Sequence, residues 1–273
     1  MHSALPAKAL IGMIHVQALP GAPFSRHLVR EVVGQAAEEA VVLARAGFDA
    51  IMIENMHDRP YVHGRHGPEV VAAMTAAGLA ASDAASSLRG SKVPLGVQVL
   101  SGGNREALAI ALATGAEFIR CENFVFAHVA DEGLLQEAEA GSLLRYRNQI
   151  GAEHVQIFAD LKKKHASHAI TADVPIEDAA EAARFFGADG LIVTGAATGR
   201  ACRMEDLVAV ARATELPVLV GSGVTPESCR ELLQHADGLI VGSSIKQHGF
   251  WENPPDPARC EAMVAAVRQA RAS

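Results

Sequence analysis

The chain has 273 residues, of which 49% are hydrophobic and 20% charged, and this balance excludes a disordered protein. The net charge is −7 and aromatic residues make up 4%, so the sequence has no basic, aromatic-rich stretch of the kind that binds nucleic acid. Four scattered cysteines without a CxxC pair, no signal-peptide pattern and no apolar run near the roughly 20 residues of a membrane helix predict a cytoplasmic protein with reduced thiols and no integral membrane segment.

Eight short apolar segments follow one another along the chain, and each has the length and composition of a buried β-strand. They cover residues 9–15, 49–54, 94–99, 116–122, 154–160, 189–194, 217–221 and 237–242. The sequence ADGLIV occurs twice, at residues 188–193 and 236–241, each time before a Gly/Ser/Thr-rich loop. Strands that are apolar along most of their length are typical of a parallel sheet covered on both faces.

Helical patterns rich in alanine, leucine and glutamate separate these strands, and several of them end at glycine, a common helix stop. We expect helices within residues 30–47, 104–115, 131–151, 175–187 and 257–272. Eight parallel strands alternating with helices predict an α/β protein with a single domain, residues 1–273, folded as a (β/α)8 TIM barrel. A doubly wound open sheet is the alternative, and it is disfavoured because no GxGxxG motif opens the first unit.

Alternation of side chains along each strand separates residues that face the helices from residues that face the barrel axis. In the fifth strand, Val155 and Ile157 are expected to face the helices, whereas Asp160 faces inward. The same count predicts a set of inward polar residues near the strand ends: His15, Gln17, Glu54, Gln98, Arg120, Glu122, Asp160, Lys162 and Thr194. Barrel enzymes keep their chemistry at this end. The alternative is a buried salt-bridge network, although such a network contributes little stability.

Two glycine-containing loops follow the last two strands. Residues 221–226 read GSGVTP, with Thr225 as the expected N-cap and Pro226 as the first residue of a helix whose N–H groups could bind an anion. Loops after strands seven and eight bind phosphate in many barrels. The alternative is that these glycines serve only to form turns. We therefore predict that these loops bind a small anionic, phosphorylated substrate through Gly221, Ser222, Gly223, Gly242 and Ser243. Thr194, Gly195 and Gln98 are predicted as further contacts.

Charged residues at the mouth are the candidate catalytic groups. Glu54, Glu122, Asp160 and His15 have the chemistry of general acids and bases. In residues 160–164 (DLKKK), neighbouring ammonium groups disfavour one another's charged form, whereas Asp160 favours it. Either Lys162 or Lys164 becomes a base or forms a Schiff base, or it stays charged and stabilises a phosphate or an oxyanion. Lys163 is expected to point toward solvent or the helix layer.

A metal site built from His15, Glu54, Asp160 or His165 is a further hypothesis. No HxH or HExxH spacing supports it, so we assign no metal ligand and leave a divalent metal open as the cofactor. The sequence also lacks a GxSxG nucleophile elbow and a clear Cys/His pair, which disfavours a serine or cysteine hydrolase.

Eight segments that span nearly the whole chain resemble the BtpA/SgcQ family, which is named partly for a photosystem I biogenesis factor. They read IGMIHVQALPGAP, IENMHDRPY, GVQVL, EFIRCENFVFAHVADEGLL, FADLKKKHA, TGAATG, VGSGVTPES and ADGLIVGSSIKQHG. The resemblance implies a barrel related to phosphate-binding barrels. It carries the family pattern over to His15, Pro20, Gly21, Glu54, Asn55, Asp58, Pro60, Asp160, Lys164, His165, Thr194, Gly195, Thr198, Gly199, Gly221, Ser222, Gly223, Gly242 and Lys246.

Two functions are consistent with these observations. The first is an enzyme that acts on a small phosphorylated compound, a sugar phosphate or a nucleoside-related molecule, by isomerisation, aldol-type cleavage or hydrolysis. The second, implied by the family name, is a non-catalytic assembly or stability factor for a photosynthetic membrane complex. The polar mouth favours the enzyme. The sequence leaves open the reaction type and whether the protein forms a homo-oligomer.

Overall fold

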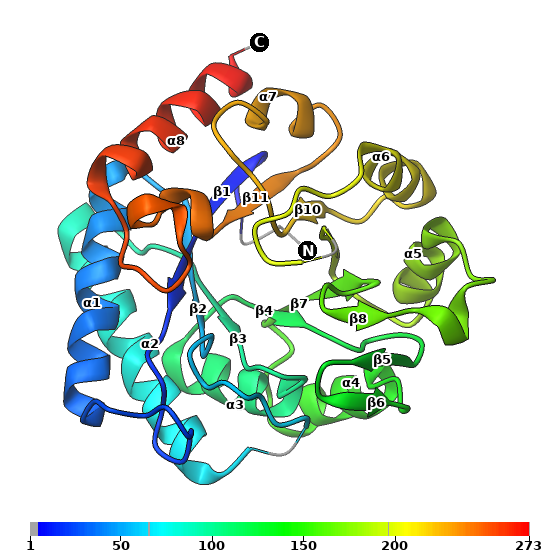
Figure 1. Cartoon of the computed structure of the whole chain (residues 1–273), viewed down its shortest axis with the longest axis horizontal. Coiled ribbons are helices and arrows are strands. Elements are labelled where there is room, and N and C mark those ends of the chain that lie inside the picture. The colour runs from blue at the N-terminus through cyan, green and yellow to red at the C-terminus, as the bar shows by residue number, and fades with distance from the viewer. Residues whose placement is uncertain (1–4, 65, 196, 273) are drawn as a thin grey trace.

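The computed structural model describes residues 5–64, 66–195 and 197–272. Its centre is a closed barrel of parallel strands in the order β1-β11-β10-β9-β7-β4-β3-β2, surrounded by helices (Figure 1). The α/β barrel is therefore confirmed, and the open sheet is excluded. The barrel strands are β1 (Ala9–His15), β2 (Ala50–Glu54), β3 (Leu95–Gln98), β4 (Phe118–Cys121), β7 (Gln156–Leu161), β9 (Gly190–Val193), β10 (Val218–Val220) and β11 (Gly238–Val241).

Helices connect successive barrel strands along the outside. They are α1 (Val29–Ala46), α2 (Pro68–Arg89), α3 (Asn104–Thr114), α4 (Ala140–Gln149), α5 (Ile176–Phe185), α6 (Met204–Ala213), α7 (Cys229–Leu232) and α8 (Pro257–Arg271), with short 3₁₀ turns η1 (Ala169–Thr171), η2 (Ser243–Ile245) and η3 (Gln247–Gly249). Gly47 ends α1 in the left-handed conformation, at φ 102°, where a residue with a side chain would be strained. Asp256 caps α8 by accepting the Arg259 N–H at 3.1 Å. None of the described helices is long and apolar enough to cross a bilayer.

The barrel interior is filled by large apolar side chains that point inward from alternate positions. Phe118 and Phe158 meet edge to face, with ring centroids 5.7 Å apart, and Met52 packs in the same cluster. A Cβ atom at Gly96 would lie 2.2 Å from the Phe118 ring, so glycine leaves the space that this ring fills. Val155 and Ile157 instead pack in the outer layer, as predicted. The apolar plug closes the barrel, and the inward polar residues lie above it.

At the N-terminal end of the barrel, an acidic residue precedes every second strand. Its carboxylate accepts a backbone N–H from the strand before it in the chain, at 2.8 or 2.9 Å. The four residues, with the donors, are Asp49 (Leu10), Glu117 (Leu95), Asp189 (Ile157) and Asp237 (Val218). The aspartate in each copy of ADGLIV is thus a structural residue that joins two strands.

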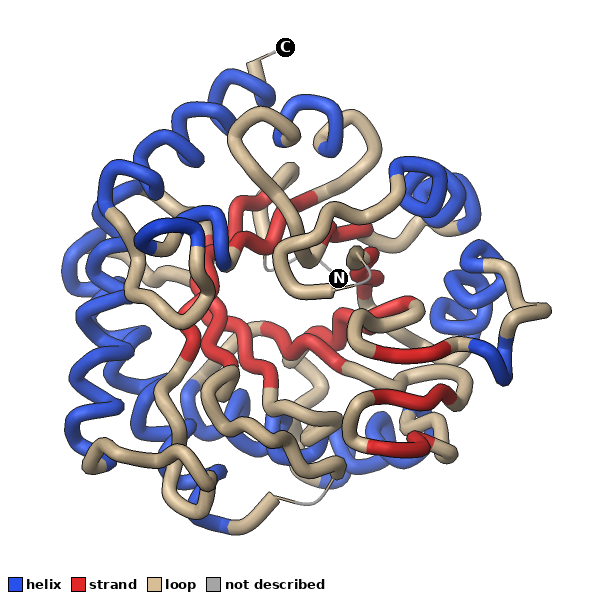
Figure 2. Tube along the Cα trace, viewed as in Figure 1, coloured by secondary structure: helices blue, strands red, loops and turns tan. Residues whose placement is uncertain are grey.

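The prediction of one helix over residues 131–151 is wrong in its first half. Strands β5 (His128–Ala130) and β6 (Gly133–Leu135) form an antiparallel hairpin, and β8 (Ala166–Ser167) pairs with β5. Figure 2 shows this small sheet outside the ring of barrel strands. Gly133 adopts φ 116°, and helix α4 begins only at Ala140. Pairing with β8, which comes from another part of the chain, overrides the local helical preference.

Candidate active site

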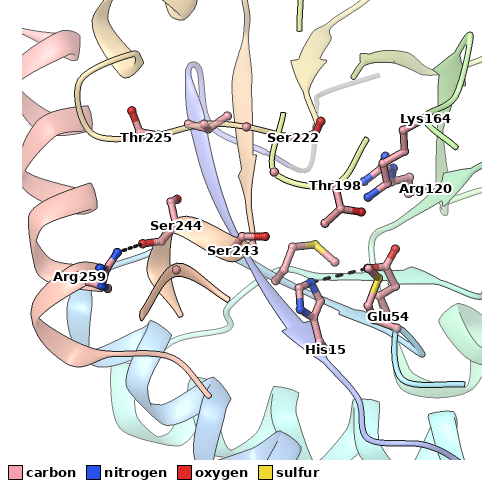
Figure 3. A pocket seen from close by; sticks show the side chains of 18 residues that line it. His15, Glu54, Arg120, Lys164, Thr198, Ser222, Thr225, Ser243, Ser244 and Arg259 are labelled. Carbon is pink, nitrogen blue, oxygen red and sulfur yellow. Dashed lines mark hydrogen bonds and ion pairs between the residues drawn. The ribbon is translucent and has the colours of Figure 1, made fainter. Parts of the chain in front are cut away.

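A cavity of about 320 Å³ lies at the carboxyl ends of the barrel strands, and the polar side chains that the sequence predicts converge on it (Figure 3). His15, Glu54, Arg120 and Lys164 lie on one side. The loops at residues 221–225 and 242–244 line the other side. The structure therefore brings candidate acid–base groups and candidate phosphate-binding loops into one cavity. Such mixed polar clefts are where barrel proteins bind small ligands.

Glu54 and His15 are neighbours because β1 and β2 pair in register at these two residues. Glu54 Oε2 lies 3.7 Å from His15 Nε2, and His15 Nδ1 lies 2.9 Å from the Trp251 carbonyl. Burial lowers the pKa of His15 well below its usual value, so the ring is neutral, donates from Nδ1 and presents the Nε2 lone pair to Glu54. Burial raises the pKa of Glu54, which Lys164 and Arg120 oppose.

Glu54 Oε1 is buried and has no hydrogen-bond partner among the described residues. An unpartnered buried carboxylate oxygen is costly, because it has lost water without gaining a donor. Since Glu54 lines the cavity, a bound ligand can supply that donor. The carboxyl group is thus placed to exchange a proton with a molecule in the cavity.

Arg120 and Asp160 form a buried, two-pronged ion pair. The guanidinium donates to both carboxylate oxygens at 3.0 to 3.1 Å. Burial raises the pKa of Asp160, and Arg120 opposes that shift. Arg120 lines the cavity, whereas Asp160 lies behind it. The geometry makes Asp160 the group that orients Arg120.

The three lysines after β7 point in different directions because Lys162 adopts a left-handed conformation, at φ 45°, which ends the extended strand. Lys162 turns away from the cavity and donates to the Val174 carbonyl at 2.6 Å. The expectation that Lys163 points outward is wrong: it is buried, 3.3 Å from Glu122. Lys164 does line the cavity, and burial lowers its pKa.

Glu122 and Gln98 are buried but do not line this cavity. Glu122 accepts the Gly102 N–H at 3.0 Å, and although burial opposes its ionisation, Lys163 and Arg120 lower its pKa. Gln98 pairs with Glu54 in the β2–β3 register. Both its amide oxygen and its amide nitrogen are buried without a partner among the described residues. Gln98, like Glu54, therefore has buried polar atoms that could still form hydrogen bonds.

The glycine-rich loops are held tightly together. Ser222 Oγ accepts the Gly195 N–H at 3.0 Å and donates to the Arg200 carbonyl at 3.1 Å. A Cβ atom at Gly223 would lie 2.2 Å from the Ala201 nitrogen, and one at Gly242 would lie 3.2 Å from the His15 ring. Close approach of neighbouring segments thus requires glycine at position 223, whereas a side chain at position 242 would press against the His15 ring.

Five predicted phosphate contacts line the cavity: Gly221, Ser222, Gly223, Gly242 and Ser243. Thr194 and Gly195 lie behind it, and the Thr194 hydroxyl is buried without a partner among the described residues. Ala196, within the predicted loop 194–199, lies outside the described residues. The predicted helix start at Pro226 is wrong, because residues 225–228 form a turn and α7 begins at Cys229. Backbone groups of the loops, rather than a long helix, face the cavity.

Sequence reasoning missed two residues that distant segments bring to the mouth. Arg259 of α8 lines the cavity beside Ser244, to whose carbonyl it donates at 3.2 Å (Figure 3). A positive charge in the first turn of a helix interacts unfavourably with the helix dipole. The position of Arg259 in the sequence could therefore have indicated that its charge serves a purpose other than helix stability. Trp251, which fixes His15, gave no comparable signal.

Some positions that the family resemblance marks have structural roles. Asn55 accepts the Leu100 N–H at 2.6 Å and donates to Asp58 at 3.0 Å, and Asp58 accepts the Leu19 N–H at 2.6 Å. Lys246 is fully buried and pairs with Glu39 of α1 at 2.5 Å. In the described part of the chain, no group of three or more His, Cys, Asp and Glu side chains is arranged to hold a metal ion.

Comparison with known proteins gives a consistent family and fold. The family model described as "BtpA family" matches residues 6–269. An uncharacterized mitochondrial protein of Caenorhabditis elegans is 45% identical over 94% of this chain and 92% of its own length. The photosystem I biogenesis protein BtpA of Synechocystis is 36% identical over 95% and 88%, and an uncharacterized protein of Pyrococcus furiosus is 36% identical over 94% of each chain.

Solved structures with low sequence identity share the barrel. Thiamine phosphate pyrophosphorylase from Pyrococcus furiosus aligns with a TM-score of 0.59 at 14% identity, over 97% of this chain and 96% of that one. Orotidine 5'-monophosphate decarboxylase from Methanocaldococcus jannaschii aligns with a TM-score of 0.58 at 14% identity, over 96% and 99%. At such identities the likeness shows the fold alone.

Proposed function

This protein belongs to the BtpA family, and from that premise and the geometry of its mouth we propose that it is an enzyme that acts on a small phosphorylated compound by acid–base chemistry. The observation that carries the proposal is a buried Glu54 oxygen without a hydrogen-bond partner, on a side chain that lines a cavity of about 320 Å³. The opposite wall of that cavity is made by the glycine loops.

The phosphate end of the substrate would lie against residues 221–225 and 242–244. The N–H groups of Gly221 and Thr225 already donate to Val193 and Ser228, so the backbone donors for phosphate would come from residues 222–224 and 242–244, where η2 adds the start of a helical turn. Arg259 supplies a positive charge to the same wall. Several of the barrels with the same fold are named for phosphorylated ligands, among them (S)-3-O-geranylgeranylglyceryl phosphate synthase from Thermoplasma acidophilum in complex with sn-glycerol-1-phosphate.

The reacting end of the substrate would lie near Glu54, Lys164 and Arg120. Glu54, with its raised pKa, would give or take the proton, and neutral His15 would accept a hydrogen bond from its protonated form. Lys164, with its lowered pKa, would act as a base or as a nucleophile. Arg120, oriented by Asp160, would stabilise developing negative charge. Isomerisation, aldol-type cleavage and hydrolysis all use such a set.

A role as an assembly or stability factor is the second candidate. The name of the Synechocystis relative, which refers to photosystem I biogenesis, is the observation that favours it. The polar groups buried without partners at the mouth favour the enzyme, because a protein that acts only through its outer surface gains nothing from them.

A thermal-shift screen tests the proposed function. Inorganic phosphate, sugar phosphates and nucleotides, each with and without divalent metals, should raise the melting temperature, since ligand at about 100 times its Kd adds about 2.7 kcal/mol to the unfolding free energy. The matched control is Ser243→Asp, which places a carboxylate in the phosphate wall and should abolish the shift. No shift at millimolar ligand, or an equal shift in the variant, would contradict the proposal.

A further inference from the structure

A second cavity, of about 250 Å³, adjoins the first at the mouth of the barrel. The two cavities share Met56, Lys164 and Thr198 as lining residues. A ligand with its phosphate on the glycine loops and its central part at Lys164 would therefore continue into the second cavity. A compound no larger than a simple sugar phosphate would leave this second space unused.

One wall of the second cavity is aromatic and well fixed. Trp251 lines it, with the Arg59 guanidinium 4.7 Å from the ring centroid and the His57 ring at 4.9 Å. Tyr61 also lines it and donates its hydroxyl to the Met56 carbonyl at 2.7 Å, which holds the ring in place. The Arg59 guanidinium covers one face of Trp251 and itself lines the cavity, so this wall consists of flat groups against which a planar ring can stack.

The other wall carries carboxylates. Glu132 lies in the turn between β5 and β6, and its Oε2 is buried, 3.7 Å from Lys163, without a hydrogen-bond partner among the described residues. Glu122 and Asp131 line the cavity beside it. These groups accept hydrogen bonds, so they match a ligand group that has N–H or O–H donors. An aliphatic chain would desolvate these carboxylates without supplying a hydrogen-bond donor to Glu132 Oε2.

Resting on the proposed function, we infer that the substrate is a phosphorylated sugar that carries a planar nitrogen heterocycle, as in a nucleoside monophosphate. The phosphate lies on the glycine loops, the sugar spans Glu54 and Lys164, and the heterocycle lies in the second cavity. There the ring stacks on the Trp251 side and donates N–H groups to Glu132. With one ligand, this arrangement uses both cavities, the aromatic wall and the Glu132 oxygen that lacks a hydrogen bond.

Trp251 is the only tryptophan of the chain, so intrinsic fluorescence reports directly on the second cavity. The wild-type protein is titrated with ribose 5-phosphate and with the 5'-monophosphates of adenosine, guanosine, cytidine and uridine. We expect at least one nucleotide to quench the fluorescence and to bind about tenfold or more tightly than ribose 5-phosphate, which is the scale of stacking one base on an aromatic side chain.

Variants at the aromatic wall separate stacking from phosphate binding, with calorimetry as the readout. Trp251→Leu should remove the advantage of the nucleotide and leave the affinity for ribose 5-phosphate within about twofold, because the sugar phosphate occupies the first cavity. Phe250→Leu is the matched control: it removes the neighbouring aromatic ring, which is 62% exposed and lines neither cavity, so the advantage should persist. An unchanged nucleotide advantage in Trp251→Leu would overturn the inference.

The ligand series also separates this inference from the proposed function. If ribose 5-phosphate binds and none of the four nucleotides binds more tightly, the heterocycle inference is overturned and the proposed function stands. If nucleosides bind as tightly as their monophosphates, the phosphate site is overturned and the ring site stands. If no phosphorylated ligand binds at millimolar concentration, both are overturned.

Discussion

The two ends of the barrel treat their acidic residues in opposite ways. At the N-terminal end, Asp49, Glu117, Asp189 and Asp237 each accept a strand N–H, and Asp189 also pairs with Arg147 at 2.6 Å. At the mouth, one oxygen of Glu54 and one of Glu132 have no hydrogen-bond partner among the described residues. The first arrangement stabilises the fold. The second costs stability until a ligand binds, and this difference distinguishes the structural end from the functional end.

The largest effect is expected when the mouth loses its acid–base group. Glu54→Gln keeps the shape of the side chain, so the fold should remain, while turnover of a substrate found in the ligand screen should fall about 10²- to 10⁴-fold. Steady-state kinetics and the melting temperature are measured together. The matched variant at the other end, Asp237→Ala, should retain turnover per folded molecule. Equal losses in the two variants would remove the distinction between the ends.

The second largest effect is expected when the buried ion pair between Arg120 and Asp160 is broken. Asp160→Asn leaves the buried Arg120 cation without its carboxylate, and the unfolding free energy should fall by about 3–5 kcal/mol in urea denaturation. The double variant Asp160→Asn, Arg120→Met removes the unpaired charge and should recover much of that loss. Unchanged stability in the single variant would show that Asp160 does not hold Arg120.

Smaller changes in the unfolding free energy, of opposite sign, are expected from two substitutions at opposite ends of the barrel. Asp237→Ala leaves the Val218 N–H without its acceptor and should lower the unfolding free energy by about 1–3 kcal/mol. Gln98→Met replaces an unpartnered buried amide by an apolar side chain of similar length, so it should keep or raise stability by about 1 kcal/mol. A loss of stability in Gln98→Met would show that the amide is satisfied in solution.

The smallest expected effect is a pH dependence of stability that arises at the mouth. Burial raises the pKa of Glu54 from 4.5, and it raises the pKa of Glu139, near the start of α4, to about 7. Between pH 4.5 and about 7 the folded state therefore binds more protons at these groups than the unfolded state does, so their contribution to the unfolding free energy falls as pH rises.

Denaturation of the wild type and of the double variant Glu54→Gln, Glu139→Gln is followed between pH 4.5 and 8, and the difference in their unfolding free energies measures this contribution. As pH rises, the unfolding free energy of the wild type should fall relative to that of the variant. This relative change should level off above the folded-state pKa values. A difference that is constant with pH would mean that neither carboxyl is perturbed.

The fold could be predicted from the sequence because burial leaves a clear pattern. Apolar runs mark the strands, and alternation assigns Val155 and Ile157 to the outer layer and Glu54 to the inside of the barrel. The direction of each lysine could not be predicted, because the left-handed conformation of Lys162 breaks the alternation. The hairpin at residues 128–135 depends on pairing with β8, which no local pattern encodes.

The candidate site was predictable only where its residues end barrel strands. His15, Glu54 and the loops after β10 and β11 follow from strand position alone. Trp251 and Arg259 come from the segment after β11, and the closed barrel brings them to the mouth. The sequence also does not show that Asp160 is engaged by Arg120, because that contact depends on side-chain geometry across two strands.

The most direct test of the central claim is the electron density of crystals soaked in ribose 5-phosphate. The account predicts a phosphate within hydrogen-bonding distance of backbone N–H groups of residues 222–224 and 242–244, and sugar hydroxyl groups that reach Glu54. A phosphate bound anywhere else, or a sugar that does not contact Glu54, would contradict it.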